Sequence, residues 1–125
     1  MTTQEVANRL VELCRTGSYE QAIKELYSEE IVSVEAEGTE DRVVKGLASI
    51  VEKGKKFEAQ LDKINSTTIT DPIVAGNLFS IGMLMNVKMK GVPVPIDMDE
   101  ICVYTVSNGK IVREEFFYPV PPQEG

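Results

Sequence analysis

Two glutamates with apolar neighbours are the residues of this sequence best suited to proton transfer. Side chains alternate along a strand, so Glu35 shares one strand face with Ile31, and Glu114 shares another with Phe116. A one-residue slip would turn Glu115 inward instead of Glu114. Apolar surroundings disfavour the charged form of a carboxyl and raise its pKa toward neutrality. We therefore expect Glu35 or Glu114 to act as a general acid or base.

Each of these roles has a structural alternative. Glu35 can be solvated by the polar loop that follows it, and Glu114 can pair with Lys63 or a tyrosine hydroxyl in a structural network. Tyr27 and Tyr104 are the predicted hydrogen-bond donors to a ligand, although a core tyrosine commonly has its hydroxyl satisfied by the protein itself. The sequence leaves these alternatives open.

The other predicted site residues would line an apolar pocket around the acids. Phenylalanine, isoleucine and methionine point to one face of the segment 77–87, and flexible thioethers adapt to irregular ligands. The same side chains would equally make an ordinary core. Glu100 follows Asp97 and Asp99 and is expected at the rim, where such acids form a solvated turn more often than a cation site. The expected lining comprises Leu10, Cys14, Phe57, Phe79, Ile81, Met83, Met85, Glu100, Cys102, Phe116 and Tyr118.

The sequence contains no histidine and only two cysteines, Cys14 and Cys102. A zinc site of the usual Cys/His kind therefore has too few ligands, and a Ser-His-Asp arrangement is excluded. The two cysteines are far apart in apolar contexts, which predicts reduced, buried thiols. We expect neither a metal nor an organic cofactor.

Charge and hydropathy exclude several classes of partner. The 125 residues carry 13 basic and 20 acidic side chains, a net charge of −7, and the densest basic group is Lys53, Lys55 and Lys56. Nucleic acid and anionic membranes are unfavourable partners for such a chain. Residues 1–10 lack the pattern of an export signal, and no apolar run approaches the roughly 20 residues of a membrane span. We expect one cytoplasmic domain over residues 1–125.

The elements that must position these residues follow from the spacing of apolar side chains. Helices are predicted over residues 3–15, 18–27 and 44–60. Strands are predicted over residues 31–36, 61–70 and 77–87, with an edge or irregular strand over 92–96. Thr3 and Ser18 are the predicted N-caps of the first two helices.

A hairpin at Asn108-Gly109 completes the predicted sheet. Asn-Gly favours a type I′ turn, which requires positive φ at both central residues, and the flanking segments 100–107 and 110–118 are rich in Val, Ile, Tyr and Phe. Helices followed by several antiparallel strands indicate the α+β class, with helices gathered on one face of a curved antiparallel sheet.

This order resembles the nuclear transport factor 2-like superfamily, and within it the SnoaL-like branch. The matching segments are LYSEEIVSVE over 26–35, Lys45-Gly46 and NGKIVREEFFY over 108–118. The resemblance implies a conical α+β barrel with a cavity between sheet and helices, and a homodimer formed through the outer sheet face. The expected dimer contact comprises Leu78, Ser80, Gly82 and Leu84.

The resemblance also implies an activity. Ketosteroid isomerase, in the same superfamily, has a carboxylate base at the end of the first strand, which matches Glu35; its oxyanion tyrosine and second acid would fall near Leu10 and Cys102. SnoaL-type polyketide cyclases use a carboxylic acid in an apolar cavity, for which Glu35 or Glu114 is suitable. We expect binding of a small hydrophobic molecule and proton transfer next to its carbonyl (isomerisation, cyclisation or dehydration). The alternative is a non-catalytic ligand-binding or dimerisation module.

Overall fold

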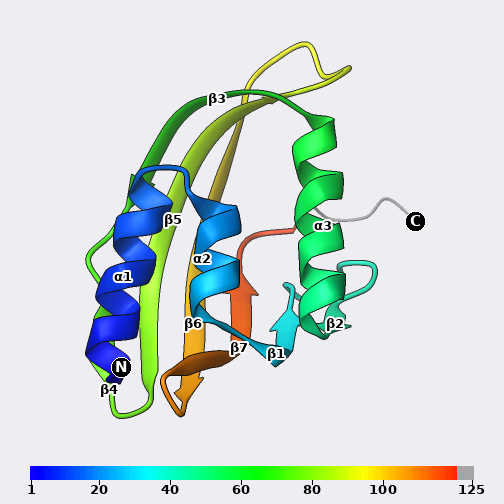
Figure 1. Cartoon of the computed structure of the whole chain (residues 1–125). Helices are drawn as coiled ribbons and strands as arrows, with labels where there is room; N and C mark the ends of the chain where they lie inside the picture. Colours follow the sequence, from blue (N-terminus) through cyan, green and yellow to red (C-terminus); the bar gives the residue numbers. More distant parts are fainter. Residues whose placement is uncertain (121–125) are drawn as a thin grey trace.

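Three helices lie on one side of a curved sheet in this computed structural model, which describes residues 1–120 (Figure 1). The helices are α1 (Thr3–Arg15), α2 (Tyr19–Leu26) and α3 (Leu47–Gln60). The strands are β1 (Tyr27–Val34), β2 (Val43–Lys45), β3 (Leu61–Ile69), β4 (Ile73–Ala75), β5 (Leu78–Met89), β6 (Ile96–Ser107) and β7 (Lys110–Phe117). The predicted α+β class is confirmed.

The sheet is mixed and remains open. Its strand order is β2-β1-β7-β6-β5-β3, and β4 pairs with β5 outside this path. The expectation of an entirely antiparallel sheet is wrong at one pairing, because β1 and β7 run parallel. Within residues 1–120, β2 and β3 form the two edges, so the strands do not close into a barrel. Two irregularities in the register between β3 and β5 accompany the bend of this edge.

The predicted Asn-Gly hairpin is confirmed. Asn108 and Gly109 have φ values of 50° and 75°, as a type I′ turn requires. Val106 pairs with Ile111 and Thr105 with Arg113, so Val112 is an extra residue that bulges from β7. The alternation of inward and outward side chains, expected to run unbroken along this strand, is therefore interrupted at Val112. Ile111 is buried in its place, while Glu114 keeps its inward orientation.

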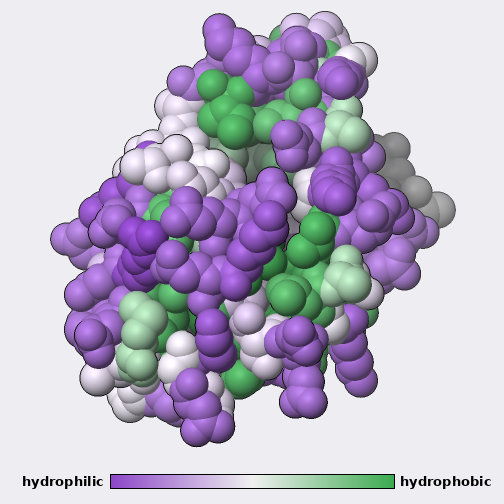
Figure 2. All heavy atoms as spheres, viewed as in Figure 1, coloured by the Kyte–Doolittle hydropathy of each residue, from purple (hydrophilic) through white to green (hydrophobic). Residues whose placement is uncertain are grey.

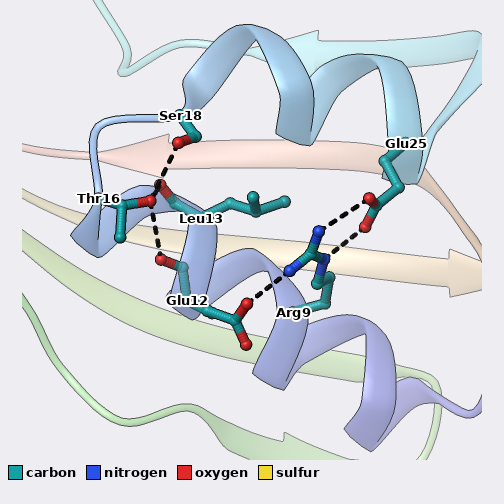
Figure 3. Close-up of polar contacts among 6 residues, drawn as sticks. All are labelled: Arg9, Glu12, Leu13, Thr16, Ser18 and Glu25. Atoms are coloured by element: carbon teal, nitrogen blue, oxygen red, sulfur yellow. Dashed lines mark hydrogen bonds and ion pairs between the residues drawn. The ribbon is translucent and has the colours of Figure 1, made fainter.

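A network of polar contacts holds α1 against α2 (Figure 3). The Arg9 guanidinium donates from Nε to Glu25 Oε2 at 2.6 Å and also contacts the carboxylate of Glu12. At the turn between the helices, the hydroxyls of Thr16 and Ser18 lie 3.0 Å apart. The helical hairpin thus has one ion-pair network at its surface and one hydroxyl pair at its turn.

The N-cap predicted for α1 is wrong by one residue, whereas the N-cap position predicted for α2 is confirmed. Thr2, not Thr3, caps α1, since its hydroxyl accepts from the Glu5 backbone N–H while the Glu5 carboxylate accepts from the Thr2 N–H. Ser18 is the N-cap of α2 but makes no side-chain capping bond. These ends depend on local backbone geometry that apolar spacing does not determine.

Several short elements were predicted wrongly. Residues 44–45, placed in the third helix, belong to β2, because Gly46 with a φ of 91° separates them from α3. The first strand begins at Tyr27, which was assigned to the second helix. Residues 92–95 lie in a turn rather than an edge strand, consistent with two prolines that cannot donate to a ladder.

The core fills only part of the concave face. Phe79 and Tyr104 stack with ring centroids 4.8 Å apart, below α1, which packs on β3 and β5. Farther along β5 and β6 the inner side chains become half-buried. Figure 2 shows hydrophobic atoms gathered near the upper ends of β3, β5 and α3, framed by hydrophilic ones. This half of the concave face, not covered by α1 and α2, is called the open end.

Gly109→Ala tests the tight hairpin turn. A Cβ at this positive φ would be strained and would lie 3.1 Å from the Met1 backbone nitrogen. We expect a loss of about 1–3 kcal/mol in the free energy of unfolding, measured by urea denaturation. Gly54→Ala in α3 is the matched control: its Cβ meets nothing within 4 Å, so we expect a gain of about 0.5–1 kcal/mol. Equal losses in the two variants would contradict the assigned turn geometry.

Candidate functional site

The predicted site residues divide into a buried set and a half-buried set. The buried set packs within the core or next to it and comprises Leu10, Cys14, Phe79, Ile81, Cys102, Tyr104 and Glu114. The half-buried set comprises Tyr27, Glu35, Phe57, Met83, Met85, Glu100, Phe116 and Tyr118. Both predicted cysteines are free thiols, as expected. The binding role of both sets stays a prediction. Their side-chain hydrogen bonds involve three glutamates, Glu35, Glu100 and Glu114.

Glu114 is the deepest of these glutamates. It lies on β7 with 4% of its surface exposed and accepts a hydrogen bond from the Tyr27 hydroxyl. Ser33 is its register partner on β1 and is fully buried, and its hydroxyl lies beside the Glu114 carboxyl as a second potential donor. Burial raises the pKa of Glu114, and the bond from Tyr27 offsets part of that rise. Tyr104 makes no hydrogen bond to any of the three glutamates in residues 1–120.

Glu35 lies just past the end of β1 and has two donors. Lys53 Nζ donates to Oε1, and the Tyr118 hydroxyl donates to Oε2 at 2.7 Å. The same ammonium lies 5.5 Å from the centroid of the Phe116 ring, in a cation–π contact. The Glu35 side chain is 14% exposed, so its charge is compensated in a largely desolvated position.

Sequence reasoning missed Lys53. It was grouped with two other lysines as part of a charged helix surface. The signal was its spacing: Lys53 follows Ile50 by three residues and precedes Phe57 by four, which places all three on one side of α3. Ile50 is buried and Phe57 half-buried, so this side faces the sheet.

Glu100 lies on β6 without a compensating cation. The Cys102 thiol donates to its Oε1 at 3.6 Å, and within residues 1–120 no ion pair involves this carboxyl. Burial raises the pKa of Glu100 to about 7, with the negative charge of Glu35 as the next cause. A carboxyl with this pKa exchanges its proton readily near neutral pH, as a general acid or base must.

Methionines form the apolar wall beside Glu100. Met83 pairs with Glu100 across β5 and β6, Met85 pairs with Met98, and all four side chains are half-buried. Sequence reasoning missed Met98, although its spacing of two residues from Glu100 was the available signal. Thioether side chains give this wall an adaptable, polarisable surface.

Two hollows open on the described surface. One of about 380 Å³ lies where β1 and β7 end and reaches Glu35, Phe116 and Tyr118. A second of about 520 Å³ lies beside Lys24 and Lys110, away from the three glutamates. Neither is lined by the buried set of predicted residues. Of the half-buried set, the first hollow reaches Glu35, Phe116 and Tyr118 and the second reaches Tyr27, while neither reaches Glu100.

Residues 1–120 contain no group of three or more His, Cys, Asp or Glu side chains placed to hold a metal ion. None of their helices combines the length and apolar composition that a membrane span requires.

The three helices on a curved open sheet define the nuclear transport factor 2-like fold. The family model described as "SnoaL-like domain" matches residues 1–118, and the chain belongs to this family. No curated protein matches the sequence.

Solved structures agree with this assignment. The chain is similar to a Mesorhizobium loti protein named as a SnoaL-like polyketide cyclase and carbohydrate phosphatase, with 29% identity, a TM-score of 0.89, and coverage of 94% of this chain and 100% of that one. An NTF2-like protein from Burkholderia pseudomallei shares the fold at 10% identity and a TM-score of 0.77, over 95% and 92% of the two chains. TerC, co-crystallised with polyporic acid, also shares the fold, with 16% identity, a TM-score of 0.74, and coverage of 94% of this chain and 90% of that one.

Glu100→Gln tests the desolvation of this carboxyl. The pKa of Glu100 is about 7 in the folded protein and 4.5 in the unfolded chain, so between these pH values the folded state binds more protons than the unfolded state. The free energy of unfolding of the wild type therefore falls as the pH rises from 4.5 through 7. We expect the variant to be more stable than wild type by about 1–3 kcal/mol at pH 8 and equal to it at pH 4. Chemical denaturation across pH measures this difference. Glu52→Gln, at an exposed position of α3, is the control; a pH-independent difference for Glu100→Gln would refute the raised pKa.

Proposed function

We propose that this protein binds a small, largely apolar carbonyl compound at the open end and transfers a proton next to the carbonyl, with Glu100 as the acid–base group. The observation that carries the proposal is the half-buried Glu100 carboxyl, which forms no ion pair within residues 1–120 and whose pKa is raised to about 7 by burial. Its position between the core and the rim allows contact with a ligand. The methionines beside it provide a surface for a flat hydrophobic body.

Each group of the site has a proposed role. Glu100 removes a proton from the carbon adjacent to the carbonyl and returns it to a neighbouring position, which gives isomerisation, cyclisation or dehydration depending on the substrate. Lys53, held by Glu35, polarises the carbonyl oxygen as negative charge develops on it. These roles require no organic cofactor.

The expected acid–base groups receive different roles in this proposal. Glu35 is compensated by Lys53 and Tyr118, so it positions the ammonium rather than taking the proton. Glu114 is buried in the core beside Tyr27, so it has no direct contact with a ligand in this proposal. Tyr104 supports the core under the site through its stacking on Phe79.

The comparisons support a carbonyl substrate. The structural relative from M. loti carries the name of a polyketide cyclase, and TerC was crystallised with polyporic acid. The cyclase designation is consistent with proton chemistry on an oxygenated compound, whereas the second designation of the M. loti protein, carbohydrate phosphatase, gives this proposal no support. For this chain the substrate class is a proposal based on the methionine wall and the acid beside it.

Exchange of a carbon-bound proton tests the activity. With 2-indanone in D₂O as probe, we expect enzyme-dependent loss of the α-proton NMR signal, with a rate that rises with pH to a plateau above about pH 7. Glu100→Gln should lower the rate by about 10²–10⁴-fold. Glu52→Gln should leave it unchanged. Equal rates for wild type and Glu100→Gln would remove Glu100 from the mechanism.

A second proposal, from a different class, is that two copies of the chain associate through the outer sheet face. Ile101 and Phe117 pair across β6 and β7 and are 58% and 51% exposed, with the exposed Leu84 nearby on β5. A monomer rarely presents neighbouring large apolar side chains on a flat sheet without a partner. Arg113 and Glu115 place both signs of charge on the same strand, so a two-fold axis need not bring like charges together.

Ile101→Lys tests the dimer. Because a buried lysine in a self-complementary contact occurs twice, we expect the variant to be monomeric at concentrations where the wild type is dimeric, by analytical ultracentrifugation. Val94→Lys is the control, since Val94 has a similar exposure of 60% in the turn outside this face. A monomeric wild type, or a dimer that survives Ile101→Lys, would contradict the proposal.

A further inference from the structure

The hollow where β1 and β7 end has the size and the lining of a small binding site. The two strands run parallel and end next to each other, and the space of about 380 Å³ at their ends lies within the range of ligand pockets. Its apolar walls include the buried Val34 and Ala36, together with Phe117 and Val120. Glu100 does not line it, so a ligand in this hollow need not touch the proposed acid–base group.

The charges around this hollow are largely paired. Two carboxylates of the lining have cations of their own: Lys53 contacts Glu35, and Arg113 contacts Glu115 at 2.6 Å. The other charged residues of the lining are Glu37 and Arg42, one of each sign. An ion entering the hollow would lose part of its hydration and meet charges that are already balanced. These surroundings favour a neutral ligand over a charged one.

One hydroxyl of the lining keeps its oxygen free to accept a hydrogen bond. Tyr118 donates its proton to Glu35 Oε2 at 2.7 Å, which leaves the lone pairs of its own oxygen for an outside donor. The Thr39 hydroxyl lies beside that of Tyr118, but its proton goes to the Ala36 carbonyl at 2.6 Å. Within residues 1–120, the bond to Glu35 is the hydrogen bond that the Tyr118 hydroxyl makes.

The bond to Glu35 makes Tyr118 a better acceptor and holds it in place. A hydroxyl that donates to a carboxylate gains electron density on its oxygen, because successive hydrogen bonds polarise one another. Burial raises the pKa of Tyr118 and the bond to Glu35 adds to the rise, so the phenol keeps its proton for this bond at neutral pH. Lys53 occupies the other carboxylate oxygen and fixes Glu35. The Tyr118 oxygen is thus an acceptor in a defined position.

We propose that the hollow at the ends of β1 and β7 binds a neutral ring compound through a hydroxyl group that donates to the Tyr118 oxygen. The ring lies against the apolar walls of the hollow, next to Val34 and Ala36. The ligand class is a phenol or a cyclic alcohol, because an ether has no proton to donate and an acid or amine would bring a charge. The inference goes beyond the proposed function, since it assigns a ligand to a place that Glu100 does not reach.

Two probes of matched shape, phenol and anisole, test the inference. Both carry the same ring, but anisole has a methyl ether in place of the hydroxyl and cannot donate. Binding is measured by NMR titration of the methyl signals of the whole chain. An apolar hollow alone would favour anisole, the more apolar probe, whereas one hydrogen bond to Tyr118 should make phenol bind about three- to tenfold more tightly. Both probes should shift the methyl signals of Val34, Ala36 and Val120.

Tyr118→Phe locates the effect, because it removes the acceptor oxygen and keeps the ring. In this variant we expect phenol to bind no more tightly than anisole. Anisole should bind as it does to the wild type, which shows that the hollow remains folded. Tyr19→Phe is the matched control, since Tyr19 lies on α2 and does not line the hollow. It should keep the full preference for phenol.

The outcomes separate this inference from the proposed activity. No binding of phenol, phenol binding no tighter than that of anisole, a preference that Tyr118→Phe leaves intact or that Tyr19→Phe removes equally, or shifts that spare the three lining residues would each overturn the inference. Proton exchange on 2-indanone without a preference for phenol would overturn it and leave the proposed activity in place. A preference for phenol that Tyr118→Phe alone removes would support the inference whether or not 2-indanone exchanges its protons.

Discussion

The burial of carboxyl groups without an equal number of cations is the constraint on which the concave face depends. Glu114 lies in β7, between β1 and β6, where water cannot solvate it and where the hydroxyl of Tyr27 is its hydrogen-bond partner. A desolvated, unpaired carboxylate is unfavourable, so such a group keeps its proton to a higher pH. Glu100, nearer the rim, is likewise desolvated, and the negative charge of Glu35 adds to the rise in its pKa. The burial that makes these carboxyl groups unfavourable for folding is thus also what raises the pKa of Glu100.

The fold produces this arrangement by a few specific features. The parallel pairing of β1 and β7 brings Ser33 beside Glu114, and the bulge at Val112 lets Ile111 fill the core while Glu114 still points inward. Helix α3 packs against β1 and β2 and places Lys53 beside Glu35. The buried core does not extend to the ends of β5 and β6 at which Met83, Met85, Met98 and Glu100 lie. The same strands therefore carry packed apolar residues at one end and these half-buried residues at the other.

Local signals predicted the local features well. The Asn-Gly turn, the first helix and the alternation of β5 depend on residues close in sequence, and the structure confirms them. The parallel pairing, the three-residue strands β2 and β4 and the bulge at Val112 depend on contacts between distant segments, which no local pattern encodes. The inward orientation of Glu35 and Glu114 follows from alternation along one strand and was predicted. Lys53 reaches Glu35 from α3, and Ser33 reaches Glu114 through the register of β1 and β7, so neither contact was predicted. Glu100 was named as a rim residue; the neighbours that raise its pKa became visible only in three dimensions.

The central claim is that Glu100 is a desolvated acid whose proton is exchangeable near neutral pH. It is tested most directly by a ¹³C NMR titration of the glutamate side-chain carboxyls in the ligand-free protein, with Glu100→Gln used to assign the signal. We expect the Glu100 signal to titrate with a midpoint near pH 7. A midpoint near the ordinary value of 4.5 would contradict this, because the carboxyl would then be solvated and the basis for the proton transfer would be lost.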